Sequence, residues 1–292
     1  MRLHDVLVAV KSSRPWWSGK LVTITRSCES LVSRMRLGLR AQCVLLCCLL
    51  HFQVVNGWGP FTHQFFSSLD DSHAKQIGFR AGASAPDAFK HISPQLHNPL
   101  FASVLFQVAE ESGQGIDFAL GYGCHLSHDA VGHHTAGFLN PSEDHPLEFA
   151  MDSFIAKELS PPSFCQITPS EIALVVNASV KAAAEYPKIK AIDLKQAQEA
   201  VLKFRALTTA EAVAMPLNFE YKSQLIKESY CKVTTLSQVV ANFNQSRDWS
   251  VEACRFWEST MTNGTINATE ARNRMEEFVQ NLFNHHNNTS CT

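Results

Sequence analysis

The chain has 292 residues, of which 45% are hydrophobic and 18% charged, a globular composition that suffices for one large domain or two small ones. Its 25 Lys and Arg against 27 Asp and Glu give a net charge of −2. A chain without a basic excess has no general electrostatic attraction to nucleic acid or to anionic membranes, which disfavours long nucleic acid as a partner.

The first 57 residues are expected to be absent from the mature protein. Met35 opens a segment with a basic start, an apolar core over 43–50 and small residues shortly before Trp58, which is the layout of a secretory signal peptide. The core is far shorter than the ~20 residues that span a bilayer, which disfavours a signal anchor. We therefore predict an upstream extension (1–34), a signal peptide (35–57) and a secreted mature domain (58–292).

Charge and glycosylation signals agree with secretion. Removing 1–57 takes away 8 basic and 2 acidic residues, so 17 and 25 remain and the mature net charge is −8. No apolar tail is seen, so neither a GPI anchor nor a C-terminal membrane span is expected. Acceptor sequons for N-glycosylation stand at Asn177, Asn244, Asn263, Asn267, Asn287 and Asn288.

Five of the nine cysteines remain in the mature domain. Cys124 lies in an apolar stretch and is expected to be a buried free thiol. The other four can form two disulfides in a secreted protein, with three pairings that the sequence leaves open. These four are Cys165, Cys231, Cys254 and Cys291.

The hydrophobic pattern of the mature domain is helical, without any alternating strand pattern, so we predict an all-α fold with a single helical domain. A capping box from Thr168 to Glu171 and a cap at Asp193 mark two helix starts. Residues 80–91 form a Gly/Ala/Pro loop that carries Asp87. The expected helices cover 64–79, 98–112, 116 onward, 169–186, 194–215, 218–243, 248–262 and 267–284.

The most informative stretch is 121–138, GYGCHLSHDAVGHHTAGF. In a helix, His125, Asp129 and His133 stand at i, i+4 and i+8, so their side chains share one face. Imidazole nitrogens and a carboxylate are donors that suit Zn²⁺. Three of its glycines, Gly121, Gly123 and Gly132, each cost roughly 1 kcal/mol against alanine in a helix, which predicts close packing or an access requirement.

Further candidate donors are confined to the first part of the mature domain. Together with His125, Asp129 and His133 they make nine donors, which lie within 91 residues. No histidine follows them until His285, which argues for a site rather than chance. The nine are the Trp58 amine, His63, Asp87, His97, His125, Asp129, His133, His145 and Glu148.

This ordered set resembles the zinc-dependent phospholipases C and D. That family includes the N-terminal domain of glycosylphosphatidylinositol-specific phospholipase D and is related to fungal zinc-dependent nucleases. Its processed N-terminus, often a Trp, binds zinc through its own amine, and a histidine follows, as in Trp58 and His63 here. The loop AGASAPDAF over 81–89, followed by His97, is similar to the family's AG-x3-PD-x-F loop and next histidine.

The resemblance extends through the H-x3-D-x3-H stretch to about residue 155. His145 and Glu148 would complete it, but the acid stands at +3 where the family usually has +4, so Asp152 remains an alternative to Glu148. The fold implied is a helical domain built around a multi-zinc site.

By analogy, Asp87, His97, His125 and Asp129 would hold one zinc; His133, His145 and Glu148 a second; and Trp58, His63 and Asp129 a third. Asp129 would bridge two of these sets. The activity implied is phosphodiester hydrolysis by a hydroxide shared between two zincs. The leaving-group proton would come from metal-bound water or from Asp87.

Phospholipid hydrolysis of the C or D type, with transient contact to a membrane surface, is the leading functional hypothesis. A nuclease or nucleotide phosphodiesterase is the first alternative, although a mature charge of −8 makes nucleic acid unlikely as a partner. A secreted protein whose zincs only brace the fold is the alternative from another class.

The remaining histidines have simpler expected roles. His128 and His134 lie outside the three-donor face and are expected in supporting or core positions. His73 and His91 are expected at the surface. Trp249, Phe256 and Trp257 fall at helical spacing and are expected in the core rather than in a lipid-docking stripe.

Overall fold

The computed structural model describes residues 58–69, 76–135, 150–157, 159, 163–214, 236–262 and isolated positions between 269 and 281. All of them belong to the second of two units into which the chain divides, 53–292. Over these residues every regular element is helical, which confirms the all-α prediction for that part of the chain. The elements are α3 (Pro60–Ser67), α4 (Ile77–Gly82), α5 (Ala85–Phe89), η2 (Pro94–Leu96), α6 (Pro99–Ser112), α7 (Ile116–Thr135), α9 (Pro169–Glu185), α10 (Leu194–Ala214) and α12 (Leu236–Thr262).

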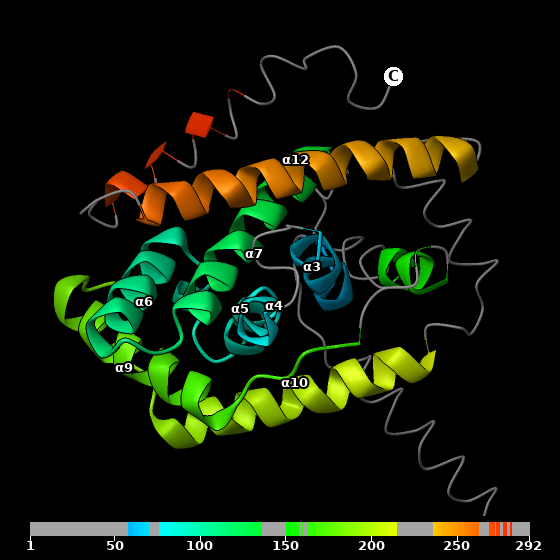
Figure 1. The fold of residues 1–292 in the computed structure, drawn as a ribbon. Coiled ribbons are helices and arrows are strands. Elements are labelled where there is room, and N and C mark those ends of the chain that lie inside the picture. Colours follow the sequence, from blue (N-terminus) through cyan, green and yellow to red (C-terminus); the bar gives the residue numbers. More distant parts are fainter. Residues whose placement is uncertain are drawn as a thin grey trace, which may run out of the picture. The chain divides into compact units, whose positions relative to one another are not determined.

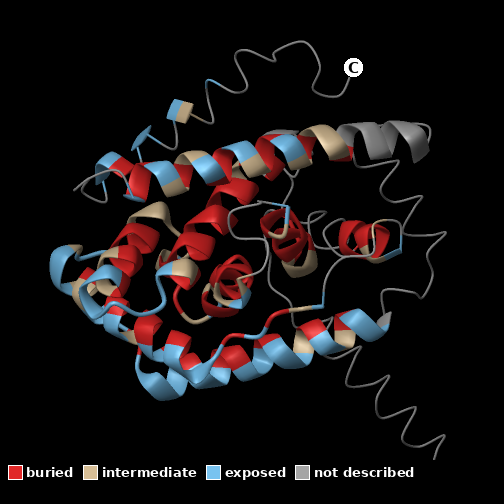
Figure 2. Cartoon of the chain, viewed as in Figure 1, coloured by how far each residue is buried: buried red, intermediate tan, exposed pale blue. Residues whose placement is uncertain are grey.

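Helix α7 is the centre of this arrangement. It packs most extensively on α12 and also on α4 and α6, while α10 lies along α5 and α9 (Figure 1). Its buried side chains are mostly apolar, and Asp117 stands in its first turn, where a carboxylate stabilises the helix dipole. Figure 2 shows α4, α5 and most of α7 buried, whereas α9, α10 and α12 have exposed outer sides. The histidine-rich helix is therefore an interior helix.

Glycine lets α4 and α7 approach backbone to backbone. A Cβ on Gly121 would lie 2.0 Å from the carbonyl oxygen of Phe79, and a Cβ on Gly82 would lie 2.1 Å from that of Phe118. Any side chain at either position would force the helices apart. The predicted packing role of the glycines is thus confirmed at Gly121. The close crossing brings α5, which follows α4, to the donor face of α7.

The predicted helix starts are confirmed by their side-chain caps. Thr168 Oγ1 accepts from the Glu171 N–H at 3.4 Å, and Glu171 Oε2 accepts from the Thr168 N–H at 2.6 Å, which completes the capping box of α9. Asp193 Oδ1 accepts from the Gln196 N–H at 2.8 Å at the start of α10.

Three helix boundaries differ from the prediction. The single helix expected over 64–79 is α3 and α4, two separate helices. The loop expected over 80–91 contains the end of α4 and all of α5, because Pro86 fits the first turn of a helix. The runs expected to end at 243 and to start at 248 are one helix, α12. Phe243 before the polar residues and Trp249 after them are both buried, so the helix packs on both sides of this polar stretch. Most of 218–235 and 267–284 lies outside the described residues.

The expectation for Cys124 is wrong. Cys124 on α7 forms a disulfide with Cys254 on α12, whereas Cys165 is a buried free thiol. All three pairings expected among Cys165, Cys231, Cys254 and Cys291 are therefore wrong, since each of them used both Cys165 and Cys254. Spacing could not reveal this bond, because the two cysteines are 130 residues apart and meet only when α7 and α12 pack. Cys231 and Cys291 lie outside the described residues.

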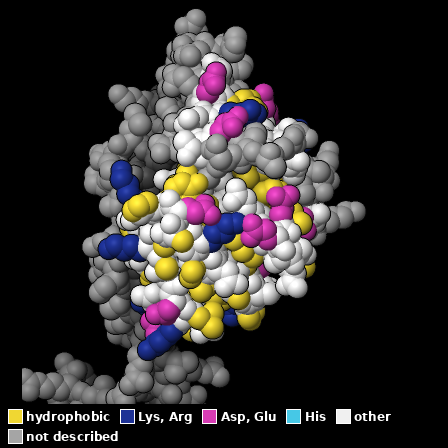
Figure 3. Space-filling view, turned by 90° about the vertical axis from the view of Figure 1, so that its left-hand side faces the viewer, with side chains coloured by type: hydrophobic (Ala, Val, Ile, Leu, Met, Phe, Trp, Pro, Cys, Tyr) yellow, Lys and Arg dark blue, Asp and Glu magenta, His cyan; other side chains and the backbone are white. Residues whose placement is uncertain are grey.

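The expected core positions on α12 are confirmed. Trp249 and Trp257 are buried and Phe256 packs partly buried against the main core. On the face drawn in Figure 3, apolar side chains are interspersed with acidic and basic ones, and no described histidine is visible. Among the described helices, none is both long and apolar enough to cross a membrane.

Candidate metal site

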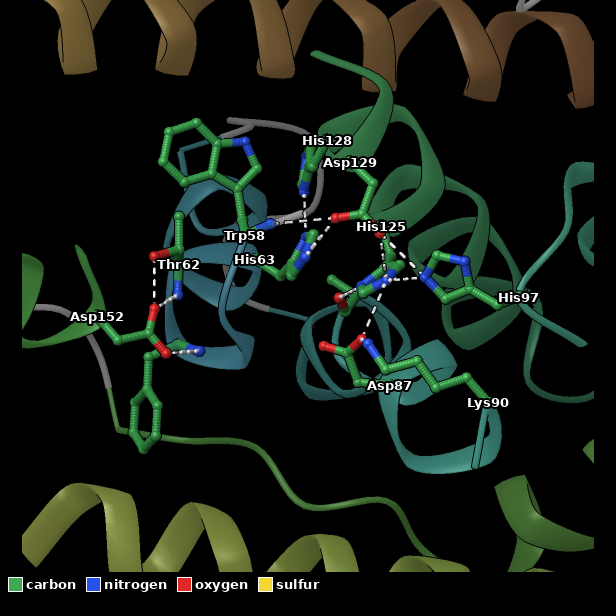
Figure 4. A network of polar contacts seen from close by, with 12 residues as sticks. Trp58, Thr62, His63, Asp87, Lys90, His97, His125, His128, Asp129 and Asp152 are labelled. Carbon is green, nitrogen blue, oxygen red and sulfur yellow. Dashed lines mark hydrogen bonds and ion pairs between the residues drawn. The ribbon is translucent and has the colours of Figure 1, made fainter. Parts of the chain in front are cut away.

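Asp129, in the middle of α7, is the centre of a buried group of His and Asp side chains (Figure 4). Its Oδ1 lies 3.1 Å from His63 Nε2 and accepts from the Trp58 main-chain N–H at 3.2 Å. Its Oδ2 lies 3.0 Å from His97 Nε2 and 3.2 Å from His125 Nε2. The two oxygens of one carboxylate therefore face two separate pairs of nitrogen atoms.

The second pair of nitrogens lies at hydrogen-bond distance. His97 Nε2 and His125 Nε2 are 2.9 Å apart, and both are near the same Asp129 oxygen. His125 also lies 3.6 Å, through Nε2, from Asp87 Oδ1 on α5. Ligand nitrogen and oxygen atoms lie this close to one another when they bind the same cation. Two overlapping groups are compatible with metal binding: His97, His125 and Asp129, and His63, Asp87 and His125.

Hydrogen bonds at the far ring nitrogens fix the orientation of two imidazoles. His125 Nδ1 lies 2.8 Å from the Ala83 carbonyl oxygen, which can only accept, so Nδ1 carries the proton and the Nε2 lone pair faces the site. His63 Nδ1 lies 3.3 Å from His128 Nδ1. If His63 donates in that contact, its Nε2 lone pair faces Asp129. His128 is thus a buried supporting residue, as expected, and it is not one of the converging donors.

The unsatisfied atoms of the group fit a metal. His63 Nε2 and Asp87 Oδ2 are buried and have no hydrogen-bond partner. His63 Nε2 is close to Asp129 Oδ1 but is not aligned with it as a hydrogen bond. An orphaned buried donor or acceptor costs about 1–3 kcal/mol. Lone pairs on His nitrogen and Asp oxygen suit Zn²⁺, so the residues present match the cofactor that the sequence predicts. The identity of the ion remains a prediction.

Burial and neighbouring charges set the protonation states. Burial lowers the pKa of His63 and of His97, which favours the neutral imidazole that a metal requires. Burial also opposes charge on His125, but Asp129 and Asp87 outweigh it and raise the pKa of that imidazole. Burial likewise opposes charge on Asp129, and His125 and His63 together hold its pKa well below the usual range.

Asp87 is ionised for a related reason. Burial would raise its pKa, but Lys90, His125 and His63 lower it to about 2. Lys90 Nζ forms an ion pair with Asp87 Oδ1, and its side chain is only 12% exposed. Lys90 therefore places an ammonium group beside the donors. Sequence reasoning missed it, although the Asp-x-x-Lys spacing over one helical turn was available as a signal.

Asp152 has a different role from the one considered for it. Its Oδ2 accepts from the Phe61 N–H at 3.1 Å, and its Oδ1 accepts from the Thr62 N–H at 2.8 Å and the Thr62 hydroxyl at 2.5 Å. Gly59, the N-cap of α3, has no side chain to do this, so Asp152 caps the helix from a distant segment. It fixes the helix that carries His63 rather than joining the converging donors. No local sequence signal identifies such a cap.

Gln64 is a second positioning residue that the sequence did not reveal. Its amide nitrogen donates to Ser84 Oγ and to the Cys165 carbonyl oxygen, both at 2.8 Å, and its Oε1 accepts from the Cys165 N–H at 2.7 Å. The amide therefore joins α3 to the segment before α5 and to the extended segment before α9.

Six of the nine predicted donors are thus brought together: Trp58, His63, Asp87, His97, His125 and Asp129. The backbone of His133 belongs to α7, but its side chain lies outside the described residues, as do His145 and Glu148. The proposed His133 set is therefore not represented among the described side chains.

No protein-family model, curated protein or solved structure matches the chain. The resemblance to the zinc-dependent phospholipases remains a hypothesis that rests on the ordered motifs.

Proposed function

We propose that the protein is a secreted zinc-dependent phosphodiesterase, with phospholipid as its leading substrate class. The observation that carries the proposal is the position of Asp129, whose two oxygens face Trp58 and His63 on one side and His97 and His125 on the other. A carboxylate placed in this way suits two metal ions held side by side, which is the arrangement of many enzymes that hydrolyse phosphate esters.

The resemblance implies how the residues would divide between the ions. Asp87, His97, His125 and Asp129 would hold one zinc, and the Trp58 amine, His63 and Asp129 another. His133, His145 and Glu148 would hold a third, which gives three per chain. Zinc bound in such sites activates water near neutral pH and neutralises charge on a phosphoryl group.

The charged groups beside these donors can take part in the reaction. Asp87, with a pKa of about 2, is a carboxylate at neutral pH, so it serves as a metal ligand or accepts a proton. It can protonate a leaving group only after it has taken up a proton. Lys90, a largely buried cation at Asp87, can pair with a phosphoryl oxygen of the substrate. His97, whose side chain is 23% exposed, is the most open of the three imidazoles in ion-pair contact with Asp129 or Asp87 and marks a side from which substrate can approach.

The position of the Trp58 main-chain nitrogen agrees with removal of a signal peptide during secretion. Its main-chain nitrogen lies 3.2 Å from Asp129 Oδ1, so cleavage after Gly57 would place a free amine at the site. The Cys124–Cys254 disulfide agrees with an oxidising compartment. The mature charge of −8 favours a substrate bound through one phosphate over a long polyanion.

The test is an assay of the secreted, purified protein against a panel of phosphodiesters: a chromogenic diester, vesicles containing choline or inositol phospholipids, and single-stranded DNA. Zinc content and products are determined on the same preparation. We expect hydrolysis of the chromogenic diester and of at least one phospholipid. Rapid cleavage of DNA alone would support the nuclease alternative. A full zinc content with no hydrolysis of any diester would overturn the proposal in favour of structural zincs.

A further inference from the structure

A second group of metal-binding side chains lies away from the His and Asp donors. It consists of Cys124 on α7 with Cys254 and Glu258 on α12. The Glu258 carboxylate lies 3.5 Å from Cys254 Sγ and 3.8 Å from Cys124 Sγ. All three donor atoms lie within 4.8 Å of one another.

The position of these residues is determined by the packing of two helices. Cys254 and Glu258 are four residues apart on α12, so they share one face of that helix. Cys124 approaches from α7, which is pressed against α12 because Gly123 leaves room for the indole of Trp257. Both cysteines are buried, whereas Glu258 is half-buried and provides an edge open to solvent.

The Glu258 carboxylate lies beside both sulfurs of the disulfide. A disulfide carries no S–H group, so neither sulfur can donate a hydrogen bond to Glu258. Reduction changes this, because two thiols or thiolates then stand beside a carboxylate. Two cysteine sulfurs and a carboxylate oxygen are ligand types that zinc prefers, and water can complete a tetrahedral shell.

We propose that the reduced chain binds one zinc ion through Cys124, Cys254 and Glu258, and that oxidation to the disulfide releases it. In the forward step a dithiol reductant gives two electrons and two protons to the S–S bond and becomes a cyclic disulfide. The two protein thiols then lose their protons to solvent as they bind Zn²⁺. The reverse step returns the two electrons to a disulfide oxidant and frees the ion. The inference is independent of the proposed phosphodiesterase activity.

The test uses the mature protein, secreted and purified, then reduced with a phosphine and titrated with Co²⁺ as a spectroscopic substitute for zinc. Thiolate bound to Co²⁺ gives a charge-transfer band that His and Asp ligands do not. We expect the band in the reduced protein at one Co²⁺ per chain and not in the oxidised protein. Cys254→Ser should abolish it, and Glu258→Gln should weaken Co²⁺ binding at least about tenfold.

Cys165→Ser is the matched control, because Cys165 is also buried but has no disulfide partner. It should leave the band unchanged. A second measurement needs no variant: zinc should slow alkylation of Cys124 and Cys254 in the reduced wild-type chain by at least about tenfold, as read by peptide mass analysis. The absence of the band, its persistence in Cys254→Ser, or equal alkylation with and without zinc would overturn the proposal.

Discussion

Asp129→Asn is the most informative substitution because it keeps the size of the side chain and removes its charge. The amide oxygen can still accept from the Trp58 N–H if it takes the place of Oδ1. The amide nitrogen then faces His97 and His125, where Oδ2 stood within 3.2 Å of both ring nitrogens. An N–H group cannot bind a metal, so the variant loses a ligand on one side and negative charge on both.

The size of the effect follows from this geometry. Loss of a mere supporting partner of a metal ligand costs about 10–100-fold in affinity or activity. Loss of a direct, charged ligand should therefore cost at least about 100-fold at each of the two donor pairs, or about 2.7 kcal/mol of binding free energy at each. We expect the loss of more than one zinc and of nearly all phosphodiesterase activity.

The assay compares zinc content after dialysis and turnover of a chromogenic diester in wild-type, Asp129→Asn and Asp117→Asn proteins. Asp117 is the matched control, because the same substitution on α7 lies 12 residues, or about 18 Å, away. It should keep all the metal and lose at most about 1 kcal/mol of helix stability. If Asp129→Asn keeps its zinc and activity, Asp129 does not bridge two ions and the proposed site is wrong.

Four further outcomes are expected. N-terminal sequencing of the secreted protein should identify Trp58 as the first residue, and any other first residue would contradict the amine ligand. One residue added before Trp58 should remove one zinc and leave the circular dichroism spectrum unchanged. His128→Asn keeps an oxygen that can accept from His63 Nδ1, so it should retain the full metal content and at least about a tenth of the activity. His128→Leu has no such acceptor and should weaken metal binding about 10–100-fold. Equal behaviour of the two variants would refute the supporting role of His128. Lys90→Met should lower kcat/KM about 10–100-fold and leave the zinc content intact. Lys181→Met is the control, because it breaks an ion pair with Glu111 instead, and it should change neither quantity. An unaltered kcat/KM in Lys90→Met would exclude Lys90 from substrate contact. Burial raises the pKa of Asp152 to about 6. Protonation of Asp152 therefore stabilises the fold, by about 3 kcal/mol, and this contribution is fully present below the unfolded pKa of ~4. It is lost as the pH rises through about 6. Urea unfolding at several pH values should therefore show Asp152→Asn gaining stability relative to wild type between pH ~4 and ~7, and a constant difference would argue against the shift.

The class of fold, and the helical face on which the candidate site is built, could be predicted from the sequence alone. The 3.6-residue periodicity and the local caps at Thr168 and Asp193 act within a few residues of chain, so they can be recognised without knowing the tertiary structure. The four-residue spacing between His125 and Asp129 places both on one helical face for the same reason. The convergence of Trp58, His63, Asp87 and His97 on that face was predicted only through the ordered resemblance, because no local rule relates those segments.

The remaining features depend on contacts between residues far apart in the chain. Cys124 meets Cys254 across 130 residues because α7 packs on α12, and no spacing rule distinguishes that pair from the others. Asp152 is a carboxylate of a ligand type, yet it caps α3 about 90 residues earlier in the chain, since Gly59 leaves the helix start without its own side-chain acceptor. Lys90 and His128 have their roles because folding buries them beside other site residues. Lys90 forms an ion pair with Asp87, and the His128 ring contacts that of His63. The sequence specifies which donor residues are present. The packing of α3, α5, α7 and α12 determines which of these residues lie in contact, because only packing brings side chains from distant segments together in a buried site.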